Sequence, residues 1–132
     1  GGSSQGTVRI LDDPEAIRKK FGSAVTDSGR EVRRAGDKPG VSNLIDILSV
    51  ATGEAPEAIE ARYAGGGYGP FKQDVGDAVV ALLEPVRERY AELRADEGEL
   101  LRQLARGADK ARSASAPTLA EMYEKMGFVR LA

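Results

Sequence analysis

Residues 38–48 read Lys-Pro-Gly-Val-Ser-Asn-Leu-Ile-Asp-Ile-Leu, and this stretch decides the fold class because it joins a helix start to a helical apolar pattern. The apolar side chains that share one helix face are Leu44, Ile47, Leu48 and Ala51. Gly53 follows at the position where helices commonly end. The stretch therefore predicts a core-facing helix from Val41 or Ser42 to Thr52.

The residues on the N-terminal side predict an earlier helix and a basic connection. Asp13 precedes Pro14, which is typical of a helix cap with proline at the first helical position. The apolar stripe that follows consists of Ile17, Phe21, Ala24 and Val25. Residues 27–40 form a polar connection, the most basic stretch of the chain, and residues 7–11 are expected to be extended.

On the C-terminal side, two more helices come next. Pro56 opens a short helix that the glycines at 65–67 end. A long helix is predicted from Phe71, and its shared apolar face consists of Val75, Ala78, Val79, Leu82, Val86, Tyr90 and Leu93. Because proline removes a backbone hydrogen bond, we expect Pro85 to kink this helix.

Residues 96–98 separate the long helix from a fifth one. Its side chains predicted to face inward are Leu100 or Leu101, Leu104, Ala108 and Ala111. Pro117 should then break or kink the chain, and Gly127 should cap the end. We therefore predict an all-α bundle of five or six helices with short connections, formed by one domain over residues 7–132. Residues 1–6 are interpreted as a flexible tail or a cloning remnant.

The composition of the 132 residues excludes several kinds of site. Without histidine or cysteine, the chain cannot supply a Ser-His-Asp triad, a reactive thiolate or the usual zinc ligands. The net charge of −2 gives no global basic field that would attract nucleic acid or an anionic membrane. The longest apolar run, residues 78–83, is far shorter than the ~20 residues that cross a bilayer. Any contact with RNA must therefore use a local basic patch.

The glycines at 65–67 precede a helix start, where exposed backbone N–H groups attract anions. The stretch lacks the preceding strand and the Gly-Lys-Ser/Thr ending of a phosphate-binding P-loop. We therefore interpret it as a turn between helices that needs the positive φ of glycine. Helix caps and solvated faces explain carboxylate pairs such as Asp12 and Asp13, so no catalytic, cofactor-binding or metal-binding residue is predicted.

Basic and aromatic side chains are the remaining candidates for binding. On the fifth helix, cations recur every four residues, a pattern that either surface ion pairs or phosphate contacts explain. Tyr68, beside glycines, is the best exposed candidate for stacking on an unpaired base, whereas Tyr90 is expected in the core. The residues predicted to contact nucleic acid are Arg30, Arg33, Arg34, Lys38, Tyr68, Lys72, Arg102, Arg106 and Lys110.

Six blocks, in order along the chain, carry a family resemblance. They read Asp-Asp-Pro-Glu-Ala-Ile-Arg-Lys-Lys-Phe at 12–21, Ser-Ala-Val-Thr-Asp-Ser at 23–28, Lys-Pro-Gly-Val-Ser-Asn-Leu at 38–44, Gly-Tyr-Gly-Pro-Phe-Lys-Gln-Asp at 67–74, Glu-Pro-Val-Arg-Glu-Arg-Tyr at 84–90 and Gly-Ala-Asp-Lys-Ala-Arg at 107–112. Together they resemble the C-terminal part of bacterial tryptophanyl-tRNA synthetases, over roughly residues 8 to 127. The chain departs from that family at Gly66, where lysine is usual, and at Pro70, where an acidic residue is usual.

This resemblance implies the helical, anticodon-binding domain of a class I aminoacyl-tRNA synthetase, detached from the Rossmann-type domain that binds ATP and tryptophan. Its implied partners are tRNA(Trp) and that catalytic domain, and neither DNA nor a membrane is among them. The implied parent enzyme is a cytoplasmic homodimer that uses ATP and magnesium. Neither catalytic signature of the family, the His-Ile-Gly-His-like block or the Lys-Met-Ser-Lys-Ser-like loop, occurs in the chain. We therefore expect no cofactor in this chain and no activation of tryptophan by it alone.

Two alternatives to this interpretation stay open. In the first, the chain is a structural docking module whose exposed apolar face packs against the catalytic domain and contacts RNA little. In the second, the chain belongs to an active enzyme whose catalytic half is supplied by another polypeptide. The salt dependence of tRNA binding bears on the first alternative, because contacts to phosphate release counterions.

Overall fold

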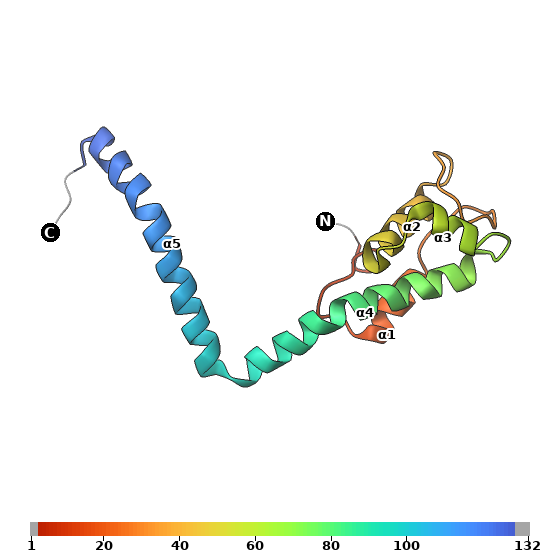
Figure 1. The fold of residues 1–132 in the computed structure, drawn as a ribbon, viewed down its shortest axis with the longest axis horizontal. Coiled ribbons are helices and arrows are strands. Elements are labelled where there is room, and N and C mark those ends of the chain that lie inside the picture. The colour runs from red at the N-terminus through yellow and green to blue at the C-terminus, as the bar shows by residue number, and fades with distance from the viewer. Residues whose placement is uncertain (1–2, 129–132) are drawn as a thin grey trace. The chain divides into compact units, whose positions relative to one another are not determined.

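The computed structural model describes residues 3–128 and has five helices in that range (Figure 1). They are α1 (Pro14–Gly22), α2 (Pro39–Thr52), α3 (Pro56–Arg62), α4 (Tyr68–Ala95) and α5 (Glu97–Met126). No strand occurs in the described part, which confirms the all-α prediction. The chain divides into two compact units, Gly1–Glu88 and Arg89–Ala132. No helix within residues 3–128 has the length and apolar character needed to cross a membrane.

The core of the first unit forms where α1, α2 and α3 pack around the first part of α4 (Figure 1). Phe71, near the start of α4, is fully buried and meets the Tyr63 ring edge to face at a centroid distance of 5.1 Å. The other core side chains are Ile17, Phe21, Val32, Val41, Leu44, Ile45, Leu48, Ile59, Val75, Val79 and Val80. Burial of apolar surface, worth roughly 25 cal/mol per Å², is the main force that holds this unit together.

Prolines and capping residues set the helix ends, as the sequence predicts. Asp13 caps α1, because its carboxylate accepts a hydrogen bond from the Glu15 N–H at 2.9 Å. Gly53 and Gly127 follow α2 and α5 in the left-handed conformation, with φ of 76° and 72°. α2 begins at Pro39, earlier than predicted, because the fixed φ of proline suits the first helical position.

The turn between α3 and α4 confirms the interpretation of the glycine-rich stretch. Gly65 and Gly67 have φ of 79° and 73°, a region that L side chains rarely adopt. α4 begins at Tyr68 rather than at Phe71, so Pro70 lies in the first turn of the helix, where its missing N–H costs nothing.

Several predicted faces and one predicted break are wrong. α1 ends at Gly22, so Val25 lies beyond the helix and is 89% exposed. Of the two outcomes predicted at Pro117, a break or a kink, the break does not occur: α5 continues through this proline to Met126. Tyr90, expected in the core, is 47% exposed. The side chains of α5 expected to face inward but found exposed are Leu101, Leu104 and Ala111.

The connection between α1 and α2, residues 23–38, is fixed to the helices at several points. Val32, in its middle, belongs to the core and is 4% exposed. The Arg34 N–H donates to Glu60 Oε1 of α3 at 2.6 Å. The Ala35 N–H donates to Ser42 Oγ of α2 at 3.1 Å. The second half of the connection is therefore held by core packing and by hydrogen bonds to two helices.

The first half of the connection passes very close to α2 at Gly40. A Cβ atom at this position would fall well inside contact distance of the Val25 carbonyl oxygen. Glycine is required here by the lack of space, since no other side chain avoids that backbone atom.

Replacing Gly40 with alanine should destabilise the fold by about 1–3 kcal/mol, because the added methyl group overpacks against backbone. Chemical denaturation followed by circular dichroism measures this change in the free energy of unfolding. Gly22→Ala is the matched control, since a Cβ at Gly22 meets nothing within 4 Å. Equal stability of the two variants would show that the connection does not approach α2 so closely.

Candidate nucleic-acid interface

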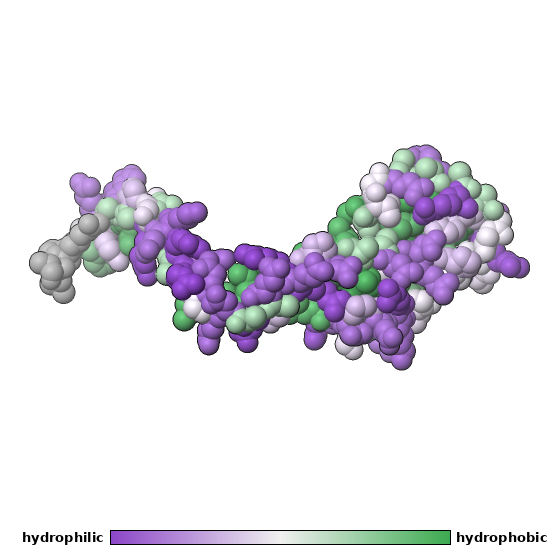
Figure 2. Space-filling view, turned by 60° about the horizontal axis from the view of Figure 1, so that its bottom comes forward, coloured by the Kyte–Doolittle hydropathy of each residue, from purple (hydrophilic) through white to green (hydrophobic). Residues whose placement is uncertain are grey.

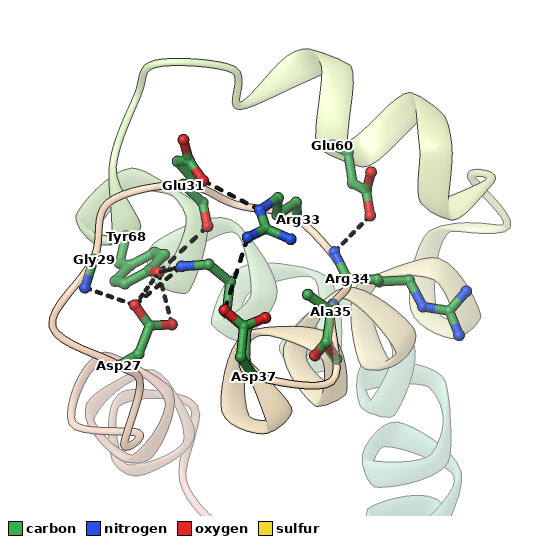
Figure 3. Close-up of polar contacts among 11 residues, drawn as sticks. Asp27, Gly29, Glu31, Arg33, Arg34, Ala35, Asp37, Glu60 and Tyr68 are labelled. Atoms are coloured by element: carbon green, nitrogen blue, oxygen red, sulfur yellow. Dashed lines mark hydrogen bonds and ion pairs between the residues drawn. The ribbon is translucent and has the colours of Figure 1, made fainter.

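Three residues of the connection, Asp27, Gly29 and Lys38, form one hydrogen-bonded cluster with Tyr68 of α4. Figure 3 labels Asp27, Gly29 and Tyr68 in this cluster. The Tyr68 hydroxyl oxygen lies 2.8 and 2.9 Å from the two carboxylate oxygens of Asp27. Lys38 Nζ donates to the Tyr68 hydroxyl oxygen at 2.9 Å and forms an ion pair with Asp27 Oδ1 at 3.1 Å. The Gly29 N–H donates to the same carboxylate oxygen at 2.6 Å. We call these four residues the Asp27 cluster.

The cluster surrounds a charged ammonium group that is largely shielded from water. Lys38 is only 7% exposed, and it is the one buried charged residue within the described range. A buried charge without partners is costly, so the carboxylate of Asp27 must lie close to it. The Tyr68 hydroxyl, followed by the Lys38 ammonium and the Gly29 N–H, lowers the pKa of Asp27 from 3.8 to about 2. Tyr68 and Asp27 in turn raise the pKa of Lys38, so both charges persist at neutral pH.

The cluster leaves no room for a side chain at position 29. A Cβ atom on Gly29 would lie 2.5 Å from Asp27 Oδ1, 2.9 Å from Lys38 Nζ and 3.4 Å from the Tyr68 hydroxyl oxygen. The atoms that would have to move are the hydrogen-bonding atoms of the cluster itself. A side chain at position 29 would therefore displace these atoms and weaken the cluster.

Arg33 and Arg34, both predicted to contact phosphate, form ion pairs, those of Arg33 within the connection (Figure 3) and that of Arg34 with α2. Arg33 lies 3.1 Å from Glu31 and 3.8 Å from Asp37, and the hydrogen bond to Glu31 raises the pKa of Arg33. Arg34 lies 3.3 Å from Asp46 of α2. About half of each guanidinium side chain is exposed, at 47% and 48%, so these pairs are weak and can be exchanged for a phosphate.

Arg30 differs from these two arginines. Its exposed guanidinium makes no ion pair or hydrogen bond with another residue in the part that the structure describes. It lies beside the α3–α4 turn, since a Cβ atom on Gly67 would be 4.0 Å from Arg30 Nε. Lys72 is engaged within the fold, because its Nζ donates to the Ala24 carbonyl at 2.7 Å.

The last three predicted residues lie on α5, in the second unit. Arg102 and Arg106 both pair with Glu99, at 2.9 and 3.0 Å, and these contacts lower the pKa of Glu99. Lys110 makes no ion pair within residues 3–128. The predicted residues that share the first unit are Arg30, Arg33, Arg34, Lys38, Tyr68 and Lys72.

Sequence reasoning missed Asp27, which it treats only as a polar loop residue. Three of the blocks that carry the family resemblance each supply one member of the cluster: Asp27, Lys38 and Tyr68. The blocks thus indicated which segments matter, but they do not show which of their residues contact one another. The roles of Lys38 and Tyr68 in contacting nucleic acid stay predictions.

Comparison with known proteins places these residues in a family. A family model described as tRNA synthetases class I (W and Y) matches residues 1–84. The tryptophan–tRNA ligase of Mycobacterium leprae is 43% identical over 128 residues, which are 96% of this chain and 37% of that relative. The tryptophan–tRNA ligase of Leifsonia xyli subsp. xyli is 48% identical over 130 residues, which are 97% of this chain and 38% of that relative. The chain thus spans a little over a third of the length of these curated relatives.

A solved structure has a similar fold. The crystal structure of tryptophanyl-tRNA synthetase from Mycoplasma pneumoniae matches 98% of this chain and 41% of its own chain, with a TM-score of 0.83. The sequence identity is 24%, so this likeness concerns the fold alone.

The Asp27 carboxyl should titrate with a midpoint near pH 2, and Tyr68→Phe should raise that midpoint toward 3.8, because the Tyr68 hydroxyl is the largest cause of the low pKa. Since folding lowers this pKa, the stabilisation by the ionised carboxylate is present above pH 3.8 and is lost as the pH falls to about 2. Carboxyl ¹³C NMR measures the midpoint. Tyr90→Phe, outside the cluster, should leave it unchanged. A midpoint near 3.8 in the unsubstituted chain would contradict the cluster geometry.

Proposed function

Because the chain belongs to the family of class I tRNA synthetases (W and Y), we propose that it is the helical tRNA-binding domain of a tryptophan–tRNA ligase. In this role it binds the anticodon region of tRNA(Trp). The observation that carries the proposal is an identity of 43% and 48% to two tryptophan–tRNA ligases over 96% and 97% of the chain.

The α1–α2 connection supplies the surface for this role. Cationic side chains bind RNA phosphates, whereas hydrogen bonds and stacking read unpaired bases. Arg30 offers an exposed guanidinium, and Arg33 and Arg34 hold half-exposed ion pairs that a phosphate can replace. Such a local patch suits a chain whose net charge is −2.

The proposal assigns the other steps of the reaction to the rest of the enzyme. The parent enzyme is a cytoplasmic homodimer that binds ATP and magnesium through its catalytic domain, which is also the partner of this chain. The proposal places no cofactor in this chain, whose α3–α4 turn lacks the pattern of a phosphate-binding P-loop. This chain alone does not activate tryptophan. It binds tRNA weakly by itself, because it lacks the avidity of the complete enzyme.

Arg30→Gln should weaken binding of tRNA(Trp) roughly five- to tenfold and reduce the slope of log K against log salt by about 1, because one phosphate contact is lost. Filter-binding titrations over a series of salt concentrations measure both quantities. Arg89→Gln is the matched control, because it removes an exposed arginine of the second unit. An unchanged slope for Arg30→Gln would assign Arg30 to solubility rather than to RNA contact.

The same titration tests whether the chain reads the anticodon. A tRNA(Trp) with an altered anticodon should bind more weakly than the cognate tRNA, because base contacts carry the sequence specificity. If both bind alike, or neither binds, the proposed anticodon recognition is wrong.

The surface of α5 favours a second function, docking onto the catalytic domain. α5 buries no side chain within the described range, although one of its faces is apolar. The apolar side chains on that face, 45–62% exposed, are Leu101, Leu104, Leu119, Met122 and Met126. Figure 2 shows that, on the face in view, hydrophobic surface lies in patches among hydrophilic side chains. An apolar helix face of this length is typical of a contact with another protein surface.

Leu104→Glu should weaken binding to the catalytic domain, supplied as a separate polypeptide, at least tenfold, or about 1.4 kcal/mol. The thermal unfolding midpoint of the chain should not change, because Leu104 is 61% exposed. Isothermal titration calorimetry measures the association, and Ser113→Glu, at an exposed polar position of α5, is the control. If Leu104→Glu binds the catalytic domain as tightly as the unsubstituted chain, docking does not use this face. Tryptophan-dependent pyrophosphate exchange of the mixture shows whether the two polypeptides together form an active enzyme.

A further inference from the structure

We propose that Tyr68 contributes to RNA binding as a positioning residue: through Asp27 it fixes the backbone just before Arg30, and it does not stack on a base. This inference rests on the proposed tRNA-binding function. It assigns the Asp27 cluster a role that differs from the direct nucleic-acid contact expected of Tyr68 and Lys38.

The polar group of Tyr68 is fully used within the fold. Its hydroxyl donates to the Asp27 carboxylate, at 2.8 and 2.9 Å, and accepts a hydrogen bond from Lys38 at 2.9 Å. The Lys38 ammonium also lies 5.7 Å from the centroid of the Tyr68 ring, within the range of a cation–π contact. Movement of the ring toward a base would break these contacts and leave the buried Lys38 without one of its partners.

The backbone is anchored on each side of Arg30, before it by the cluster and after it by the core. The Gly29 N–H donates to Asp27 at 2.6 Å, and the Glu31 carbonyl lies 3.3 Å from the Tyr68 hydroxyl. The next residue, Val32, is anchored in the core at 4% exposure. The backbone of Arg30 is therefore held on both sides, while its guanidinium stays exposed beside the α3–α4 turn.

Loss of the Tyr68 hydroxyl should release this backbone without removing any cation. The Arg30 contact with phosphate would still form, but the connection would have to be ordered when RNA binds, which lowers the affinity. The number of counterions released would not change, so the salt slope should stay the same. Arg30→Gln, by contrast, removes the cation and should reduce the slope. The two variants thus distinguish positioning from charge.

Tyr68→Phe keeps the aromatic ring, so any stacking on a base would survive in this variant. We expect binding of tRNA(Trp) to weaken about three- to tenfold with an unchanged salt slope. Amide hydrogen exchange at residues 29–31 should become faster. The thermal unfolding midpoint should fall while the chain stays folded, because the buried Lys38 loses one hydrogen-bond partner. Gly29→Ala should act in the same way, because its Cβ would lie 2.5 Å from Asp27 Oδ1. Gly36→Ala, on the same connection, is the control, since its Cβ meets nothing within 4 Å.

Three outcomes would overturn the inference. First, Tyr68→Phe and Gly29→Ala could bind tRNA(Trp), and exchange the amide hydrogens of residues 29–31, as the unsubstituted chain does. That result would show that the cluster does not position Arg30. Full binding by Tyr68→Phe with weak binding by Tyr68→Leu would show that the ring stacks on a base. If the unsubstituted chain binds no tRNA, the proposed function fails, and hydrogen exchange still tests the cluster: unchanged exchange at residues 29–31 in Tyr68→Phe would overturn it.

Discussion

Burial of the Lys38 ammonium is the constraint on which the arrangement of the α1–α2 connection depends. Lys38 precedes the first residue of α2, in a place where only 7% of it reaches solvent. A charge in that position needs a carboxylate and a further hydrogen-bonding group, which Asp27 and Tyr68 provide. One electrostatic requirement thus holds both ends of the connection against the start of α4.

The helices were largely predictable because their ends are determined locally. Prolines at first helical positions, the Asp13 cap and the glycines after α2 and α5 act through the backbone of their own segment, so the sequence displays them. Burial was less predictable. Periodicity identifies side chains that share a face, as on α5, but a face is buried only where another element covers it. For this reason Tyr90 and Leu104 are exposed although their spacing suggests a core.

The candidate site was predictable in its charges but not in its pairings. The arginines of the connection are visible in the sequence, and they do lie on the surface of the first unit. Some of these arginines form ion pairs with residues outside their own segment, as Arg34 does with Asp46. No local sequence pattern predicts such pairs. Asp27 and Tyr68 are 41 residues apart, so only the folded chain shows that the Tyr68 hydroxyl donates a hydrogen bond to the Asp27 carboxylate.

The anchoring of the connection also determines where its length can vary. Val32 and Lys38 fix the two ends of a short arc, and within that arc the Lys38 N–H closes a turn onto the Ala35 carbonyl at 3.0 Å. The space around Gly36 is open. Because the entropy of closing a loop grows slowly, by about 0.6 kcal/mol for each doubling of its length, residues inserted at this turn cost the fold little. Insertions between Asp27 and Val32 would instead separate Arg30 from the groups that hold it.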